Sequence, residues 1–310
     1  MKNILVSGSI AYDHIMFYKG RFKESLIPEE LDNLSVSFLA DSRETFFGGC
    51  APNIAYTLNL LGEKPMILGV AGNDFDDYRD WLNSNRITSE CVQIDDGNPT
   101  AAAYILADNS HNQISIFSPG ASAAVEICKN LSCCDLSSVD FAVLAPDIPG
   151  RMLTIAENLI RDKVPFLFDP GQAISALSKE YLAIIIDGCK GIIANEYETS
   201  LLVEKMRMNL SQLTGWAGFY VETLGENGCT IFENGEQTHV PAIGGMHVVD
   251  VTGCGDAFRA GFVHGYVNDK SLKESCKIAC TAASFVVSKN GTQTHSFTKD
   301  EFESRLRKFY

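Results

Sequence analysis

Short apolar runs alternate with amphipathic segments along most of the chain, and this alternation predicts strands separated by helices. Strands are expected at residues 3–8, 66–70, 141–145, 165–169, 191–194 and 218–224, and helices at about 51–61, 74–85, 151–161, 179–186, 272–288 and 299–309 and from residues 195 and 256. Strands that alternate with helices form a mostly parallel sheet with helices on both faces. We therefore expect an α/β fold with three layers, α/β/α. No internal repeat, low-complexity segment or linker interrupts the pattern, so residues 1–310 are expected to form one domain.

Two strand-rich insertions, at about 14–47 and 98–118, interrupt the alternation of strands and helices. They contain short apolar runs at residues 35–39, 45–47, 100–106 and 113–117. Such runs, bounded by turn residues, are typical of paired strands. The two insertions are expected to pair into one small sheet that covers a cleft, as a lid. The alternative is that each is a separate surface hairpin.

Composition and charge exclude several classes of protein. The chain is 45% hydrophobic and 21% charged, which provides ample material for a folded core. Its net charge of −14 argues against a nucleic acid or an anionic membrane surface as a partner, because both require basic patches. No apolar run reaches the length of a transmembrane helix, and residues 1–10 favour a strand over a signal peptide. We expect a cytoplasmic protein that binds phosphates, if at all, through local donors and a metal ion.

The 10 cysteines do not form a metal-binding pattern. There is no Cys-x-x-Cys, and Cys276 and Cys280, one helical turn apart, have no His or Cys partners that complete a site. We expect buried, free thiols.

The sequence Asp-Val-Thr-Gly-Cys-Gly-Asp at residues 250–256 is the most informative stretch. Gly253, Cys254 and Gly255 precede an apolar helical pattern, and backbone N–H groups at a helix N-terminus favour an anion. Asp256 is either a helix cap or a general base beside this anion site. Arg259, one turn later, either contacts a phosphate or forms an ion pair.

A second group of candidates lies near the N-terminus. Asp13 follows the first strand and its turn at Gly8-Ser9, where it either caps a turn or binds ligand hydroxyls. The pair Gly48-Gly49 precedes a helix that Gly62 ends, and glycines let the backbone approach a ligand closely. Asn53, in the first turn of that helix, is expected to face the same ligand.

Three further motifs follow strands in the C-terminal half. Asn195 and Glu198 either hold a hydrated Mg²⁺ or form a capping box. Thr223, Gly225 and Gly228 suit a nucleotide or a tight turn. Gly291-Thr292-Gln293 lies beyond the helix that ends near residue 288. The chain has no GxxxxGK[ST] motif, no GxGxxG after its first strand and no protein-kinase motif set, which argues against those nucleotide-binding classes.

The ordered set of Asp13, Gly48-Gly49 with Asn53, Asn195 with Glu198, residues 223–228 and residues 253–256 resembles the ribokinase-like (PfkB) carbohydrate and nucleoside kinases along essentially the whole chain. The segment at residues 250–256 departs from the D-T-x-G-A-G-D signature of that family, with Val251 in place of Thr and Cys254 in place of Ala. The resemblance implies a ribokinase-like fold with a small β lid. It implies that Asp256 is the base and that residues 253–255 form the anion hole. It also implies ATP near Asn195, Glu198, Thr223, Gly225 and Gly228, Mg²⁺ held by Glu198 through water, and K⁺ near Asp250 and Thr252.

Further segments, at residues 8–14, 20–22, 34–39, 78–82 and 255–262, are similar to bacterial adenosine kinases of the actinobacterial type. This similarity implies that Asp13 holds the ribose hydroxyls and that Phe117 stacks on the purine. The same pocket would be lined by Ser9, Ser37, Gly48, Gly49 and Asn53. One departure is Ala103, which stands where those enzymes have a lid aromatic, while Tyr104 points to the opposite face.

The sequence therefore predicts ATP-dependent phosphorylation of the 5′-hydroxyl of adenosine in purine salvage. The alternatives are another purine nucleoside kinase, a PfkB sugar kinase acting on ribose or fructose, and an inactive nucleotide or metabolite sensor. A purely structural α/β protein would leave the acid beside the anion site unexplained. The exposed lid strands also allow a homodimer.

Overall fold

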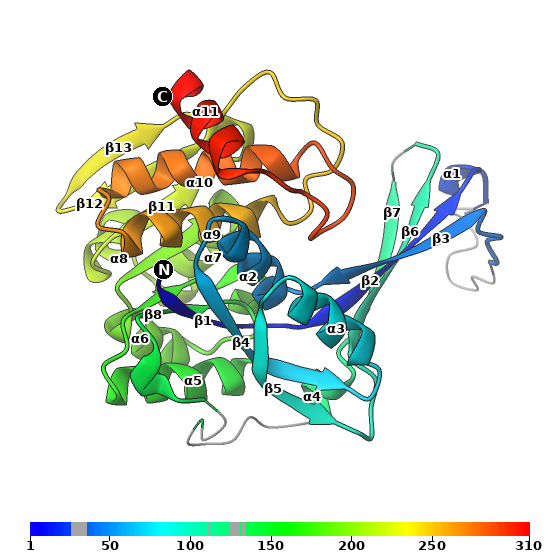
Figure 1. The fold of residues 1–310 in the computed structure, drawn as a ribbon, viewed down its shortest axis with the longest axis horizontal. Coiled ribbons are helices and arrows are strands. Elements are labelled where there is room, and N and C mark those ends of the chain that lie inside the picture. Colours follow the sequence, from blue (N-terminus) through cyan, green and yellow to red (C-terminus); the bar gives the residue numbers. More distant parts are fainter. Residues whose placement is uncertain (26–35, 111, 125–130, 132–133) are drawn as a thin grey trace.

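Nine strands of the described residues form one central sheet (Figure 1). The protein is represented by a computed structural model that describes residues 1–25, 36–110, 112–124, 131 and 134–310. Seven neighbouring strands are parallel, and β12 and β13 add an antiparallel edge. The spatial order is β13 (Glu236–Val240), β12 (Cys229–Glu233), β11 (Tyr220–Thr223), β10 (Gly191–Asn195), β9 (Phe166–Phe168), β8 (Phe141–Leu144), β1 (Asn3–Ser7), β4 (Lys64–Gly72) and β5 (Thr88–Asp95).

Helices cover both faces of this sheet. One face packs against α2 (Cys50–Leu60), α3 (Asp76–Ser84), α9 (Cys254–Val267) and α10 (Leu272–Val286). The other packs against α5 (Pro149–Arg161), α6 (Lys179–Gly188), α7 (Glu196–Met206) and α8 (Leu210–Trp216). The terminal helix α11 (Lys299–Phe309) packs on α10. Short helical turns complete the described part: α1 (Phe22–Ser25), α4 (Ala121–Ala124), η2 (Leu136–Ser138), η3 (Gly171–Ser175) and η4 (Gly225–Asn227).

The two cores follow from the alternation of side chains along each strand. On β1, Ile4 and Val6 enter the core beneath α2 and α9, whereas Leu5 enters the core beneath α5 and α6. Successive side chains of a strand point to opposite faces, so a strand that is apolar throughout can be buried on both. The predicted three-layer α/β fold is confirmed.

A four-stranded sheet projects to one side of the large sheet, at the right of Figure 1. Its order is β3 (Ser42–Gly48), β2 (Ala11–Tyr18), β6 (Ala101–Asp108) and β7 (Gln113–Ser118). The strand predicted at residues 35–39 is wrong for its described part, because residues 36–39 have no regular structure. The sheet instead uses β2, which starts soon after β1 and carries Asp13 on a strand instead of in a turn.

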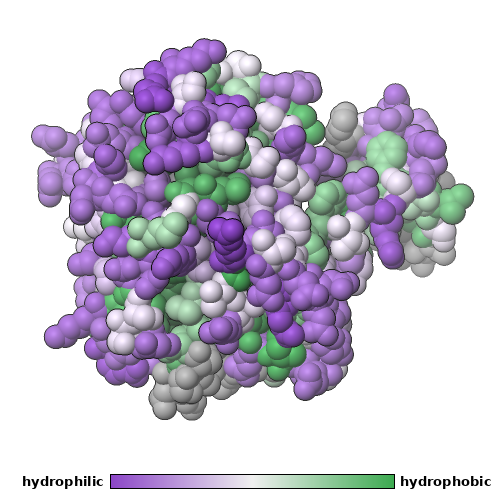
Figure 2. Space-filling view, viewed as in Figure 1, coloured by the Kyte–Doolittle hydropathy of each residue, from purple (hydrophilic) through white to green (hydrophobic). Residues whose placement is uncertain are grey.

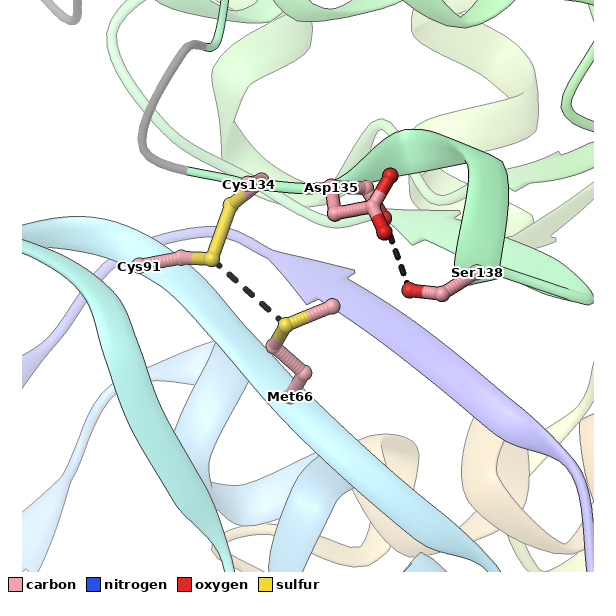
Figure 3. Close-up of a disulfide and its surroundings, with 5 residues drawn as sticks. All are labelled: Met66, Cys91, Cys134, Asp135 and Ser138. Atoms are coloured by element: carbon pink, nitrogen blue, oxygen red, sulfur yellow. Dashed lines mark hydrogen bonds between the residues drawn. A yellow bond between two sulfur atoms is a disulfide. The ribbon is translucent and has the colours of Figure 1, made fainter.

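A disulfide joins Cys91 on β5 to Cys134, which lies before η2 (Figure 3). Their Cα atoms are 5.5 Å apart although 43 residues separate them in sequence. The expectation of free thiols was therefore wrong for this pair, because sequence spacing does not show which cysteines meet in the fold. Met66 Sδ lies 3.5 Å from Cys91 Sγ on the neighbouring strand. Six other described cysteines are free.

No helix in the described ranges is both long enough and apolar enough to pass through a bilayer.

Candidate active site

Helix α9 begins within the glycine-rich motif of residues 250–256. Gly253 precedes the helix with φ at 78°, a left-handed conformation that glycine adopts without strain. The N–H of Cys254 donates to the carbonyl of Val251 over 3.2 Å, so this predicted donor closes the turn in this structure. Gly255 and Asp256 follow in the first turn, where backbone N–H groups have no partner within the helix. The helix N-terminus therefore favours an anion near these groups.

Asp256 is not the cap of α9, because Gly253 occupies the N-cap position. Its carboxyl group is half-buried, and Asn53 on α2 donates from Nδ2 to its Oδ2 over 2.9 Å. Burial raises the pKa of Asp256 to about 7, although the hydrogen bond from Asn53 and the charge of Arg259 oppose this rise. A carboxyl group with a pKa near neutrality can accept a proton from a substrate hydroxyl.

Arg259 forms the ion pair that was one of its two predicted roles. Its side chain is 7% exposed, with Nε 2.5 Å from Asp169 Oδ2 and one guanidinium nitrogen 3.6 Å from Glu198 Oε2. The same guanidinium donates to the carbonyl of Gly255 over 3.1 Å. Arg259 therefore links the start of α9 to two carboxylates that lie near the carboxyl ends of β9 and β10.

Asp169 was missed as a site residue. It directly follows β9, at the same edge of the sheet as Asn195, and is almost fully buried. Burial raises its pKa to about 6, against the opposing charge of Arg259. The available signal was its position, because an acid at the carboxyl end of a parallel strand lies where α/β proteins bind ligands.

Asn195 and Glu198 form the capping box of α7. Glu198 N–H donates to Asn195 Oδ1 and Asn195 N–H donates to Glu198 Oε2, both over 2.8 Å. No group of three or more His, Cys, Asp or Glu side chains is arranged as a metal site among the described residues. A magnesium ion usually takes one or two carboxylates together with water and substrate phosphates. Glu198, with Asp169 across Arg259, is a donor set of this kind.

The segment after β11 lies beside this capping box. Thr223 pairs with Asn195 in the register of β10 and β11, so both strand ends reach the same edge. Gly225 is the first residue of the short helix η4 and Gly228 follows its last, with φ angles of 56° and 93°. The three predicted nucleotide-binding positions are therefore close to the start of α7.

Asp13, on β2, lies against the backbone of the neighbouring strand. A Cβ atom on Gly48 would lie 2.4 Å from Asp13 Oδ2, so a side chain at this position would displace the Asp13 carboxylate. A Cβ atom on Gly49 would lie 2.5 Å from the carbonyl oxygen of Ser9, and Ser9 Oγ accepts from the N–H of Cys50 over 3.2 Å. Burial, followed by the charge of Asp250, raises the pKa of Asp13 to about 6.

The small sheet brings Phe117 onto the same row as Asp13. Asp13 pairs with Ala103, and Ala103 pairs with Phe117, so the three side chains share one face. Tyr104 is on the opposite face, as the alternation of β6 predicted. Ser37 is exposed in the irregular segment before β3 and is not part of the strands that carry Asp13 and Phe117.

Asp250 holds the loop before α9. Its Oδ1 accepts from the N–H and the hydroxyl of Thr252, over 2.9 and 2.7 Å, and its Oδ2 accepts from the N–H of Gly291 over 3.0 Å. This carboxylate therefore fixes two loops against each other.

Comparison with known proteins gives one family over almost the entire chain. The family model described as pfkB family carbohydrate kinase matches residues 1–299. A nucleoside kinase of Methanothermobacter thermautotrophicus is 28% identical over 299 residues, which are 95% of this chain and 92% of that protein.

Two solved structures are similar in fold and sequence. The nucleoside kinase of Burkholderia thailandensis in complex with inosine is 32% identical, has a TM-score of 0.87 and is covered to 98%, with 99% of this chain aligned. The nucleoside kinase of Methanocaldococcus jannaschii, described as an archaeal member of the ribokinase family, is 26% identical with a TM-score of 0.88 and 99% coverage of both chains. The chain belongs to the PfkB family of carbohydrate kinases.

Proposed function

We propose that this protein transfers the γ-phosphoryl group of ATP to the 5′-hydroxyl of a purine nucleoside, and that adenosine is the acceptor. The observation that carries the proposal is the position of Asp256. It lies in the first turn of α9, and the charge of Asp13 contributes to the rise in its pKa. Asp256 is suited to take the proton of the reacting hydroxyl, and Asp13 is suited to bind the ribose hydroxyls. The nucleoside kinases among the relatives support a nucleoside over a free sugar.

In the proposed reaction, Asp13 accepts hydrogen bonds from the ribose hydroxyls and orients the acceptor. Asp256 takes the proton of the 5′-hydroxyl as that oxygen forms a bond to the γ-phosphorus. The bond from the γ-phosphorus to the bridging oxygen breaks, and ADP leaves with the electron pair. The N–H groups at the start of α9 stabilise the negative charge that develops on the transferred group.

The ATP site would lie at the carboxyl ends of strands of the large sheet. Asn195, Glu198, Thr223, Gly225 and Gly228 lie around the carboxyl ends of β10 and β11. Magnesium, when bound to the phosphates, neutralises part of their charge, and Glu198 would hold it through water. The Burkholderia kinase has also been solved with ADP and inosine, which supports a nucleotide beside a nucleoside in this fold.

Potassium is a further proposed cofactor, near Asp250 and Thr252. Asp250 already accepts three hydrogen bonds, so its role would be to hold the loop while further oxygen atoms contact the cation. Assays with and without K⁺, at constant ionic strength, test this.

We also propose that the small sheet acts as a lid and that the protein works in the cytoplasm.

A further proposal is that two copies of the protein pair through their small sheets. Tyr104 and Ile116, neighbours on one face of this sheet, are 42% and 65% exposed. Hydrophobic atoms are visible on this part of the surface in Figure 2. Exposed apolar side chains on a sheet favour pairing with a second chain.

The test is the release of ADP from ATP and Mg²⁺ with adenosine, inosine, guanosine, ribose and fructose offered separately. Turnover with adenosine well above the others is the expected result. Highest turnover with inosine or guanosine would replace adenosine by another purine nucleoside, whereas turnover with ribose or fructose alone would make the protein a sugar kinase. No turnover with any acceptor would favour the inactive sensor, which would have no need of Asp256.

A further inference from the structure

Gln293 lies at the centre of a buried hydrogen-bond network next to the proposed site. It follows α10, in the Gly291-Thr292-Gln293 motif, and is only 4% exposed. The indole N–H of Trp81 donates to Gln293 Oε1 over 3.0 Å. On the other side, Gln293 Nε2 lies 3.0 Å from Asn53 Oδ1 and 2.6 Å from the hydroxyl of Tyr78. One side chain thus connects α2 with α3.

Two groups determine which end of the Gln293 amide faces Asn53: the indole N–H of Trp81, and the carbonyl of Phe47, which accepts from Gln293 Nε2 over 3.2 Å. An indole N–H can only donate, so the Gln293 atom that faces it must be the oxygen. The amide nitrogen then faces Asn53 and Tyr78. The hydroxyl of Tyr78 donates to the carbonyl of Gly48 over 2.8 Å, which leaves it free to accept from Gln293.

The orientation of Gln293 in turn fixes the amide of Asn53. Because Gln293 donates, the Asn53 atom that faces it must be the acceptor Oδ1. Asn53 Nδ2 is then directed at Asp256 Oδ2, 2.9 Å away. Reversing either amide would bring two acceptors or two donors together.

The backbone around Gln293 is held equally firmly. Its φ angle is 56°, a left-handed conformation that is uncommon for residues other than glycine. The hydroxyl of Thr292 donates to the carbonyl of Phe47 over 2.6 Å, and the N–H of Gly291 donates to Asp250. A conformation of this kind persists only where the surrounding contacts fix it.

We propose that Gln293, oriented by Trp81, is a positioning residue that keeps Asn53 a hydrogen-bond donor to Asp256. The inference rests on the proposed function, because the orientation matters for catalysis only if Asp256 is the base. Holding Oδ2 in this way leaves Oδ1 of the carboxylate for the acceptor hydroxyl. It also stabilises the anionic form of Asp256, which is the form that accepts a proton.

The hydrogen bonds from Trp81 through Gln293 and Asn53 to Asp256 form a relay. Other groups near Asp256 change its pKa independently of this relay. Arg259 stabilises its charged form, while Asp169 and Asp13 disfavour it. Among the residues that the structure describes, Cys50, Tyr78 and Cys254 are further titratable side chains that interact with Asp256.

The test measures the pH dependence of kcat/KM for adenosine in Gln293→Glu, Trp81→Phe and a matched control, Trp216→Phe. The carboxylate that Gln293→Glu introduces has only acceptors toward Asn53, so the Asn53 amide reverses and Asp256 loses its donor. The acidic limb of kcat/KM should move up by roughly one pH unit, with roughly fivefold lower kcat/KM at pH 7. Trp81→Phe keeps an aromatic ring beside Phe47 and Tyr56 but removes one of the two groups that orient Gln293, so a smaller shift in the same direction is expected. Trp216, at the end of α8, donates to Asp187 on α6 and is remote from the site, so its variant should leave the profile unchanged.

A double variant separates the relay from a simple effect of charge. In an Asn53→Ala background, Gln293→Glu should cause no further shift, because the residue through which it acts is gone. A shift that persists in that background would overturn the relay. Unchanged profiles for both single variants, with Asp256→Asn inactive, would also overturn it and leave the proposed base intact. An active Asp256→Asn enzyme would instead overturn the proposed function.

Discussion

At the scale of single residues, the carboxyl groups of the candidate site differ in their burial and in their hydrogen-bond partners. Burial raises the pKa of Asp256 to about 7 and that of Asp13 to about 6, both well above an ordinary aspartate. Asp256 is held by one amide donor, whereas Arg259 is held between Asp169 and Glu198. The proposed base, Asp256, therefore titrates near neutral pH, whereas Arg259 keeps its charge there.

The first prediction concerns the pH dependence of turnover. A general base acts only when it is deprotonated, and the raised pKa of Asp256 moves this requirement up to neutral pH. We expect kcat/KM for adenosine to rise with pH through a midpoint of about 7 and to be low at pH 5, because kcat/KM reports the pKa of the free enzyme. The profile is measured at low adenosine and fixed ATP; a kcat/KM that stays constant down to pH 5 would contradict the assignment.

The second prediction concerns Phe117. If its ring stacks on the purine, Phe117→Ala weakens adenosine binding by about threefold to tenfold, the usual contribution of one aromatic pair. Binding of ADP should not change. The matched control is Ile116→Ala, one residue away on the opposite face of β7. Calorimetric titration of both variants decides the question, and equal weakening in the two would argue against stacking.

Sequence patterns named most of the candidate site residues but not the side chains that they contact. The acid beside a helix start pointed to Asp256, and the motif at Gly48-Gly49 pointed to Asn53. Asp169 and Gln293 were missed as site residues, because their roles depend on contacts with residues far away in the chain. For Arg259 the sequence left two roles open, and only the fold showed the ion pair.

At the scale of helices and strands, boundaries with strong local signals were predicted closely. The predicted helix at residues 299–309 coincides with α11, whose start carries the capping box of Thr298 and Glu301. β2 and β5 were not predicted, because their polar side chains hide the alternation and their pairing partners lie elsewhere in the chain. Such strands depend on the sheet more than on their own residues.

The third prediction concerns the turn at Gly228, between η4 and β12. Its φ angle is 93°, and a Cβ atom there would lie 2.1 Å from the carbonyl oxygen of Val240. Gly228→Ala should therefore lower the free energy of unfolding by about 1–3 kcal/mol and weaken ATP binding. Thermal unfolding and nucleotide titration measure both effects. Gly150→Ala, in the first turn of α5 with no atom close to the added methyl group, is the control and should change neither.

At the scale of the whole molecule, the site lies where the two sheets meet. The large sheet supplies Asp169 and Asn195 at its strand ends, and the small sheet supplies Asp13 and Phe117. Helix α9, packed against α2 and α10, carries Asp256. A change in the angle between the sheets would therefore alter the distance between the ribose site and the base.

The fourth prediction concerns assembly through the small sheet. We expect light scattering to give a molar mass twice that of the 33.9 kDa chain. Ile116→Asp should shift the protein toward the monomer, because a charge would be buried in the interface. Ile184→Asp, an exposed position on α6, is the control. A monomeric unmodified protein at micromolar concentration would contradict pairing through the small sheet.

The most direct test of the account is the turnover of Asp256→Asn with adenosine, ATP and Mg²⁺. Asparagine keeps the shape of the side chain but cannot take the proton, so kcat should fall by roughly 10²–10⁴-fold while adenosine binding is retained. Asp80→Asn, an exposed position on α3, controls for the loss of a negative charge and should keep full activity. Near-normal turnover of Asp256→Asn would contradict the central claim that this carboxylate is the catalytic base.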